Sequence, residues 1–152
     1  MMRRKEVLEN EMQLTLPSHS QNEQLARCAV SAFLAQADPT LEELADLRTV
    51  VSEAVTNCIV HAYPQTLGQI YIRAKILAGR RIQLSVRDEG IGIADLARAM
   101  TPLYTGDPEG ERGGMGFTIM ENFTDRLHVR SKVGSGTTVV MYKTLGGGAK
   151  SE

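Results

Sequence analysis

Aromatic residues are scarce in this sequence: it has no tryptophan, and aromatic residues make up 5% of the chain. A platform of rings for stacking nucleic-acid bases is therefore not expected. The formal net charge is -1, from 17 basic and 18 acidic residues, whereas proteins that bind duplex nucleic acid normally carry a basic excess. Both absences predict that the protein has no direct nucleic-acid partner.

Cysteine is also rare. Two residues, Cys28 and Cys58, are too few for a disulfide framework and lack the Cys-x-x-Cys spacing of zinc sites. Both stand among apolar residues in helix-like stretches, so we expect two buried thiols. Residues 1–11 contain no apolar run of the signal-peptide type, and no apolar stretch reaches the length of a membrane span. These features predict a cytoplasmic protein without membrane contact.

The length of 152 residues suffices for one domain with its own core. We expect a polar lead-in over residues 1–10, the domain over 11–143, and a flexible tail over 144–152. The order of periodic segments predicts an α/β (α+β) two-layer sandwich, whose mostly antiparallel sheet is covered on one face by helices. The predicted strands cover residues 11–17, 69–77, 81–88, 126–131 and 137–143, and the predicted helices cover 20–37, 40–63, 95–100 and 116–123.

Two of these helices begin with residues that suit a cap. Ser20 is in position to cap the first, whose apolar face would consist of Leu25, Cys28, Ala29, Ala32 and Phe33. Thr40 and Glu43 have the spacing of a capping box for the second.

The second predicted helix also carries a candidate catalytic pair. Glu53 and Asn57 are four residues apart, so they share a helix face, which His61 continues. An amide oxygen can bind Mg²⁺, and a carboxylate can orient or deprotonate an attacking hydroxyl. Taken alone, the pair is more often a solvated charge beside a neutral helix residue, and we interpret His61 as structural.

A second candidate motif follows the predicted strand that ends at Asp88. A buried carboxylate there needs a donor, and the exocyclic amine of adenine is one. Gly90 and Gly92 would let the backbone approach a flat base closely. The alternative is an ordinary Asp-Glu-Gly turn.

Glycines at 113, 114 and 116 lead into a predicted helix, and free N–H groups at a helix start bind phosphate. The run is neither a Walker A loop nor a dinucleotide fingerprint, and alone it would be read as a linker. Thr137, just past the last predicted turn, could reach a base or a bridging water, although threonine is also a common strand residue. Residues 101–114 have the length of a functional lid, on which Arg112 could meet a phosphate.

In this order the motifs resemble the four nucleotide-binding boxes of the GHKL ATP-binding superfamily. Within it, the sequence is similar to the anti-sigma F factors of spore-forming bacteria over about residues 11–143. The superfamily resemblance rests on residues 53–57, 88–92, 113–116 and 134–138, and the closer one on 21–27, 52–57, 86–90 and 114–123.

This resemblance implies a serine kinase that also sequesters a protein. With ATP and Mg²⁺ bound, a homodimer would hold a sporulation sigma factor, and it would phosphorylate a STAS-domain anti-anti-sigma factor on serine. Glu53 would be the catalytic base and Asn57 the Mg²⁺ ligand. The resemblance implies ATP contacts at Asn57, Asp88, Gly90, Gly92, Thr105, Arg112, Gly114, Met115, Gly116 and Thr137, and partner contacts at Arg27 and Arg112.

The predicted lid departs from the family pattern. Asp107 replaces a lysine, and Gly106 should increase the backbone entropy of the lid. A nucleotide-gated sequestering module with little kinase activity is therefore one alternative. A stress-response anti-sigma kinase is another, and a detached histidine-kinase catalytic domain is a third, although we see no phospho-accepting helical hairpin before residue 11.

Overall fold

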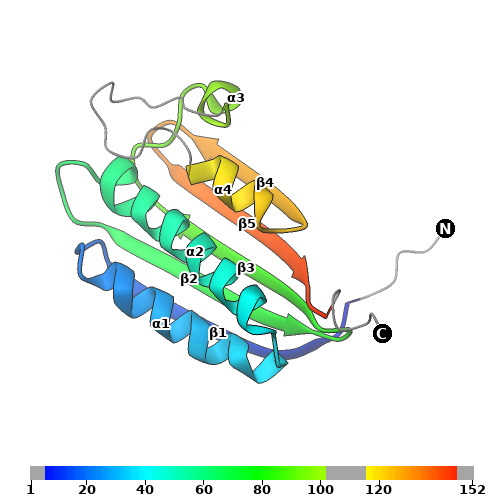
Figure 1. The fold of residues 1–152 in the computed structure, drawn as a ribbon. Helices are drawn as coiled ribbons and strands as arrows, with labels where there is room; N and C mark the ends of the chain where they lie inside the picture. Colours follow the sequence, from blue (N-terminus) through cyan, green and yellow to red (C-terminus); the bar gives the residue numbers. More distant parts are fainter. Residues whose placement is uncertain (1–5, 102–115, 147–152) are drawn as a thin grey trace.

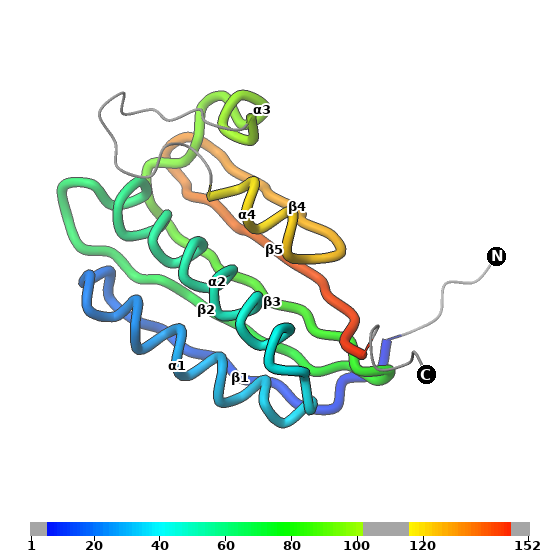
Figure 2. The backbone as a smooth tube through the Cα atoms, in the orientation of Figure 1, coloured from blue at the N-terminus to red at the C-terminus, as the bar shows by residue number. Residues whose placement is uncertain are grey.

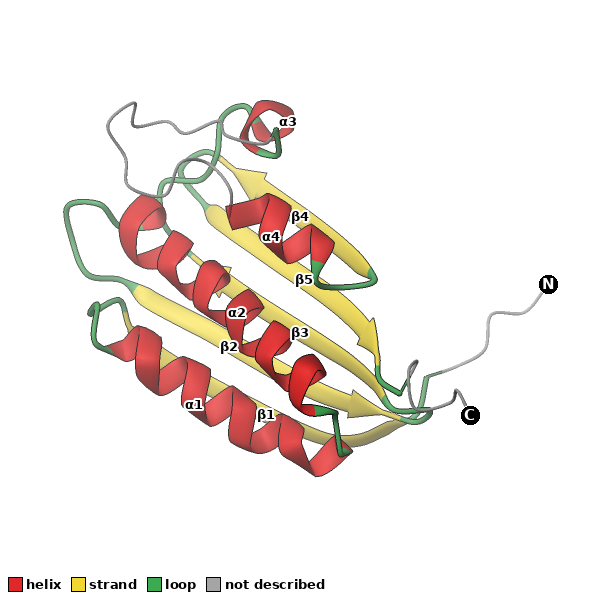
Figure 3. Cartoon of the chain, viewed as in Figure 1, coloured by secondary structure: helices red, strands yellow, loops and turns green. Residues whose placement is uncertain are grey.

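The computed structural model describes residues 6–101 and 116–146. Five strands form one sheet in the order β1-β2-β3-β5-β4, and every neighbouring pair is antiparallel (Figures 1 and 3). The predicted antiparallel sheet is confirmed. The strands are β1 (Leu8–Pro17), β2 (Gln69–Leu77), β3 (Arg81–Asp88), β4 (Arg126–Lys132) and β5 (Gly136–Thr144).

Helices α1, α2 and α4 lie on one face of this sheet, and α2 runs between the other two (Figure 2). The short helix α3 lies beyond one end of the sheet (Figure 1). The fold is therefore the two-layer sandwich that the sequence predicted. The helical segments are α1 (Asn22–Leu34), η1 (Ala35–Ala37), α2 (Leu41–Asn57), η2 (Cys58–Ala62), α3 (Leu96–Ala99) and α4 (Gly116–Asn122).

Alternation along the strands builds the core. On β2, Ile70, Ile72 and Ala74 are at most 2% exposed, whereas Tyr71 and Arg73 between them belong to the opposite face. Removing such apolar side chains from water is the main stabilising contribution to the fold. The same alternation buries Ile82, Leu84 and Val86 on β3, and Val139 and Met141 on β5.

The predicted capping box at the start of α2 is confirmed. Thr40 Oγ1 accepts from the Glu43 N–H at 3.0 Å, and Glu43 Oε1 accepts from the Thr40 N–H at 2.8 Å. The other carboxylate oxygen accepts from the Gly146 N–H at 2.8 Å. Leu145 is 3% exposed, so the packed part of the chain continues past Lys143.

The predicted cap of α1 was wrong. The N-cap position is Gln21, which makes no side-chain capping hydrogen bond. The Asn22 side chain instead donates to the Pro17 carbonyl at 2.9 Å, which fixes the turn between β1 and α1. Ser20 contributes its backbone carbonyl to that turn rather than its hydroxyl.

The predicted apolar face of α1 was wrong in part, since only Phe33 of its five residues is buried. Leu25 is 50% exposed and Cys28 is exposed, so one of the two expected buried thiols is at the surface. This helix has two adjacent apolar stripes, and the fold buries one of them. The buried residues are Ala26, Val30, Phe33 and Leu34.

The second helix ends in a wider turn than predicted. After Asn57 the α-helix continues as the π-helix η2, in which the Tyr63 N–H donates to the Cys58 carbonyl at 3.1 Å. One extra residue is thereby accommodated in the last turn, and such turns are frequent at functional sites. The helical segment ends at Ala62, as the following Pro64 led us to expect within one residue.

Candidate functional site

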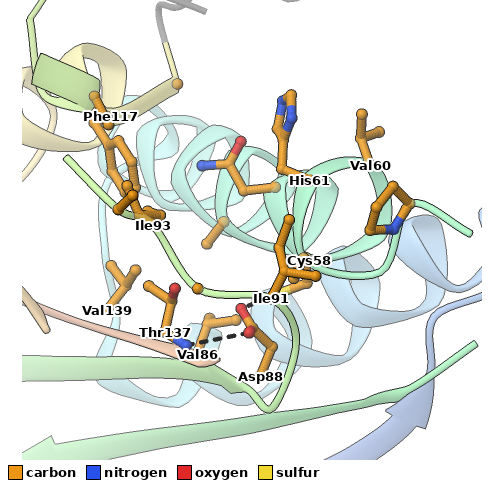
Figure 4. Close-up of a pocket in the computed structure, with 18 of the residues that line it drawn as sticks. Cys58, Val60, His61, Val86, Asp88, Ile91, Ile93, Phe117, Thr137 and Val139 are labelled. Atoms are coloured by element: carbon orange, nitrogen blue, oxygen red, sulfur yellow. Dashed lines mark hydrogen bonds between the residues drawn. The ribbon is translucent and has the colours of Figure 1, made fainter. Parts of the chain in front are cut away.

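A cavity of about 530 Å³ opens between the end of α2, the sheet and the start of α4. Its floor is formed by residues of β3 and β5, and η2 and the loop after β3 form its walls (Figure 4). Its lining brings together five residues that the sequence singled out: Asn57, Asp88, Gly92, Gly116 and Thr137.

Asp88 lies at the bottom of this cavity and is 6% exposed. Its Oδ1 accepts from the N–H of Gly90 at 2.9 Å and from that of Thr137 at 3.1 Å. Its Oδ2 accepts only the Cys58 thiol, at 3.5 Å, among the described residues (Figure 4). A carboxylate oxygen has two acceptor sites, so Oδ2 retains acceptor capacity for a donor that enters the cavity.

The loop after Asp88 is held at each step. The Glu89 N–H donates to the Tyr63 hydroxyl at 2.7 Å, and the Ile91 N–H donates to the Ala62 carbonyl at 3.1 Å. The Ile93 N–H donates to Ser131 Oγ at 2.8 Å. These bonds are all made within the chain and fix the wall of the cavity, and preorganisation of this kind favours binding.

Glycine is required at two positions of this wall. A Cβ on Gly90 would lie 2.2 Å from the Ala62 carbonyl oxygen. At Gly92, φ is +78° and a Cβ would lie 2.3 Å from the Lys132 carbonyl oxygen. The two glycines therefore permit close backbone packing behind the cavity, whereas the sequence argument placed their role at the base itself.

Glu53 and Asn57 converge on the start of α4. A Cβ on Gly116 would lie 3.2 Å from Asn57 Oδ1 and 3.4 Å from Glu53 Oε1. Glu53, on the same face of α2, is half-buried. Carboxylate, amide and glycine backbone thus meet at one edge of the cavity, although they come from segments about sixty residues apart.

Thr137 is buried at the cavity floor. Its Oγ1 lies 2.8 Å from Ser131 Oγ, which also donates to the Gly136 carbonyl at 3.2 Å. The Ser131 hydroxyl has one proton to donate. If it donates to the Gly136 carbonyl, the Thr137 hydroxyl can donate its own proton to Ser131 Oγ. If Ser131 instead donates to Thr137 Oγ1, the Thr137 proton is available to a ligand.

Two groups around Asp88 have shifted pKa values. Burial raises the pKa of the Cys58 thiol well above its usual value, and the neighbouring Asp88 carboxylate raises it further. Burial also raises the pKa of Tyr63, against a lowering by its hydrogen bond from Glu89. Both groups are therefore neutral at physiological pH and act as hydrogen-bond donors.

Other predicted site residues are not in this group. Arg27, on α1, forms an ion pair with Glu23 at 3.7 Å, on the surface between α1 and α2. Four predicted ATP or partner contacts lie outside the described residues: Thr105, Arg112, Gly114 and Met115.

Sequence reasoning missed several residues that shape the cavity. Tyr63 and Ser131 hold the loop after Asp88, and Cys58 was interpreted as an ordinary buried thiol. His61, interpreted as structural, lines the cavity. The i, i+4 spacing from Asn57 pointed to His61, whereas nothing in the local sequence signals the hydroxyls of Tyr63 and Ser131.

Comparison with known proteins identifies the domain. Residues 16–143 match the family described as histidine kinase-like ATPase domain. Over 137 residues the chain is 56% identical to the anti-sigma F factor of Caldanaerobacter subterraneus subsp. tengcongensis, covering 90% of this chain and 95% of the relative. The chain belongs to the anti-sigma F factor family. The anti-sigma F factors of Thermoanaerobacter pseudethanolicus, at 53% identity with the same coverage, and of Shouchella clausii, at 55% with 90% and 93% coverage, are similar.

Solved structures confirm the fold of this anti-sigma F family member. The RsbU and RsbW domains of a Mycobacterium tuberculosis protein superpose with a TM-score of 0.65 at 18% identity, over 90% of this chain and 33% of that one. The catalytic domain of the histidine kinase ThkA superposes with a TM-score of 0.55 at 12% identity, over 90% and 97%. The GHKL fold is therefore shown.

Membership of this ATPase family implies ATP as the ligand of the cavity. The residues of the cavity fit that ligand, because Asp88 offers a buried acceptor for an exocyclic amine while Asn57 and Gly116 lie at another edge of the cavity.

Among the described residues, no helix combines the length and the apolar character of a membrane span.

Proposed function

We propose that this protein is an ATP-dependent anti-sigma factor and serine kinase of the cytoplasm. In its ATP form a homodimer holds a sporulation sigma factor away from RNA polymerase, and it phosphorylates a STAS-domain anti-anti-sigma factor on serine. The observation that carries the kinase proposal is the convergence of Glu53 and Asn57 on Gly116. A Cβ on Gly116 would lie within 3.4 Å of a side-chain oxygen of each residue. Family membership supports the sigma-factor proposal.

The three groups at this edge have separate roles. Glu53 draws the proton from the acceptor serine, and the Asn57 amide oxygen would hold Mg²⁺. Gly116, at the start of α4, lets the backbone approach the phosphates closely. When bound, Mg²⁺ would neutralise charge on the transferring phosphoryl group, so the residues act mainly by positioning and electrostatics.

The adenine end is proposed to be read by Asp88. Its Oδ2 accepts from the exocyclic amine, and Thr137 contacts the base directly or through a water, using the proton that Ser131 leaves to it. Guanine presents a carbonyl at the place of this amine, so an acceptor there selects adenine. Arg112 and Gly114 would then contact the phosphates, and Thr105 and Met115 would also contact ATP.

Partner contacts are proposed on the α1 side. Arg27 would contact the sigma factor, and Arg112 would contact a partner or a phosphate. An exposed apolar stripe on α1, which includes Leu25 and Cys28, supports dimerisation there, as does the free edge of β1.

A phosphotransfer assay tests the kinase proposal. The protein is mixed with Mg-ATP and the STAS-domain protein encoded beside it, and phosphoserine is detected by intact mass. We expect transfer with the wild type, none with Glu53→Gln, and normal transfer with Glu121→Gln, which removes an exposed carboxylate from α4. ATP binding should survive in all three proteins.

Each contrary result points to a different conclusion. Transfer by Glu53→Gln would overturn Glu53 as the base. Absence of transfer in the wild type, with ATP and a sigma factor still bound, would indicate a sequestering module and draw attention to Gly106 and Asp107. Binding to a stress-response sigma factor in place of a sporulation one would keep the chemistry and change the partner.

A further inference from the structure

The sheet face that the helices leave uncovered carries an excess of positive charge. Cross-strand partners share a face of a sheet, so the pairing register places three central rows of residues on this open face. The rows are Thr15–Tyr71–Arg87–Thr138–Arg130, Gln13–Arg73–Ser85–Val140–His128 and Glu11–Lys75–Gln83–Tyr142–Arg126. These fifteen positions hold five arginine or lysine residues and a single carboxylate, Glu11.

The helix layer has the opposite sign. On α1 and α2, two arginines are outnumbered by acidic residues. The chain is close to neutral overall, so its two faces differ because charge is segregated between them. The residues on these two helices are Arg27 and Arg48 against Glu23, Glu42, Glu43, Asp46 and Glu53.

Few of the cations on the open face are neutralised within the described chain. Arg73 forms an ion pair with Glu11 at 3.0 Å, and Arg87 pairs with Glu89 at 3.2 Å. Across the described residues, Lys75 forms no ion pair with a carboxylate. The same holds for the two arginines of β4, Arg126 and Arg130.

Two guanidinium groups lie over tyrosine rings of this face. The Arg87 guanidinium lies 4.0 Å from the ring centre of Tyr71, and that of Arg126 lies 4.6 Å from the ring centre of Tyr142. Stacking holds each guanidinium on the sheet while its N–H donors remain at the rim, where they suit carboxylate oxygens.

We propose that this open face docks an acidic segment of a protein partner. Arginine donors match carboxylates in a bidentate manner. Neighbouring positions within a row lie roughly 5 Å apart, and successive rows, two residues apart along each strand, lie about 7 Å apart. An extended chain with carboxylates on alternate residues presents them about 7 Å apart on one side, which suits a flat array of this kind.

Three other occupants fit less well. A second copy of the same face would bring like charges together. None of the large exposed apolar side chains of the described chain belongs to these three rows, so they lack anchors for a lipid surface. Single-stranded nucleic acid stacks on free ring faces, whereas Arg87 and Arg126 each cover one ring face here.

The open face lies on the opposite side of the sheet from the ATP cavity. The cavity takes its floor from Val86, Asp88 and Val139, which alternate along their strands with Arg87, Thr138 and Val140 of the open face. Docking of an acidic segment is thus independent of phosphotransfer, and failure of either proposal leaves the other standing.

The test uses a defined probe: a fluorescein-labelled dodecapeptide of alternating Glu and Ser. Fluorescence anisotropy measures its binding to the full chain, with a Gln/Ser dodecapeptide as the uncharged control. The test variant is Lys75→Gln/Arg130→Gln, two cations of the open face that form no ion pair. The matched control is Arg48→Gln/Arg98→Gln, which removes the same charge from exposed positions on α2 and α3.

We expect the wild type to bind the Glu/Ser peptide and not the Gln/Ser peptide, with binding weakened by salt. The test variant should lose at least fivefold in affinity and the control variant less than twofold. In the wild type, the backbone amides of Thr138 and Val140 should show NMR shifts on titration; this keeps the test valid if a variant fails to fold.

Four results would overturn the proposal. They are absence of peptide binding, equal loss in the two double variants, shifts confined to the helix layer, and tighter binding of a dT12 oligonucleotide or of phosphatidylserine vesicles than of the peptide.

Discussion

Asp88 and Thr137 are 49 positions apart in the sequence, yet the Thr137 N–H donates to Asp88 Oδ1 at 3.1 Å. The bond joins the ends of two neighbouring strands and uses the carboxylate oxygen that points away from the Cys58 thiol. Asp88 therefore has one oxygen for the fold and one for the cavity.

This division predicts the effect of Asp88→Asn. An amide in place of the carboxylate must turn its NH₂ either toward the Gly90 and Thr137 N–H groups or toward the cavity, where an adenine amine is also a donor. We expect ATP affinity to fall roughly 30- to 100-fold, the size of about 2–3 kcal/mol for a buried unmatched donor. Isothermal titration calorimetry with ATP measures this. Unchanged affinity would remove Asp88 from the adenine site.

A matched control is available in Asp125→Asn. Asp125 Oδ2 accepts from the Thr144 N–H at 2.7 Å, so its substitution also disturbs a carboxylate that accepts a backbone N–H. It is exposed and remote from the cavity lining. ATP affinity should stay within twofold of the wild type.

Gly92 predicts a stability effect. At φ +78°, a Cβ would be strained and would meet the Lys132 carbonyl oxygen at 2.3 Å, and that atom belongs to backbone that has little freedom to move. We expect Gly92→Ala to lower the free energy of unfolding by about 3 kcal/mol, as strain and overpacking add. Urea denaturation followed by circular dichroism checks this.

Gly79 separates the contribution of backbone strain from that of overpacking. Its φ is +82°, but a Cβ would meet nothing within 4 Å. Gly79→Ala therefore tests strain alone, at about 1 kcal/mol. If Gly92→Ala and Gly79→Ala lowered the free energy of unfolding equally, the clash assigned to a Cβ at position 92 would be contradicted.

Glu43 predicts a dependence of stability on pH. Burial raises the pKa of its carboxyl, but hydrogen bonds from Thr40 and Gly146 and the nearby Lys143 charge lower it more, and the net pKa is below its usual value. A carboxyl with a lowered pKa in the folded state stabilises the fold above the unfolded pKa, and this stabilisation is lost as pH falls through the folded pKa. Glu43→Gln should thus be less stable than the wild type at pH 7, by roughly 1 kcal/mol.

The difference in unfolding free energy should shrink as pH falls below about 4.3, the usual glutamate pKa. Denaturation curves at pH 7, 5, 4 and 3 measure it. Glu42→Gln, in the same first turn of α2, controls for the helix dipole. A difference that stays constant across this range would show that the Glu43 charge is not the cause.

The two cysteines predict a selective labelling pattern. Cys28 is exposed, whereas Cys58 is 3% exposed and its raised pKa keeps it a thiol. Because the thiolate is the nucleophile, we expect N-ethylmaleimide at pH 8 to add one label per chain at Cys28, and a second after denaturation. Intact mass reads the count. Prompt labelling of native Cys28→Ser would mean that Cys58 is accessible.

Regular patterns in the sequence predicted most of the fold. The strand alternation, the Thr40–Glu43 box and the last hairpin are all local signals, and each was confirmed. The rotation of α1 was not predictable, because two adjacent apolar stripes are present and the sequence of the helix does not distinguish which one is buried. The π-turn at η2 was missed for a similar reason: its bonds depend on packing against the loop after Asp88.

The candidate site was predicted in part. Motif order placed Asn57, Asp88, Gly92, Gly116 and Thr137 in one cavity, and the structure brings them together. Single hydroxyls were not predictable, because Tyr63 and Ser131 reach their partners across the fold from ordinary sequence contexts.

The separation of charge between the helix layer and the open face gives the domain an electric dipole. In solution a dipole turns in the field of a charged molecule before contact, so an acidic partner would meet the sheet first and a basic partner the helices. Such steering raises encounter rates and fades once the salt concentration brings the screening length below about 10 Å. The order in which partners arrive would then depend on ionic strength, even where their final affinities do not.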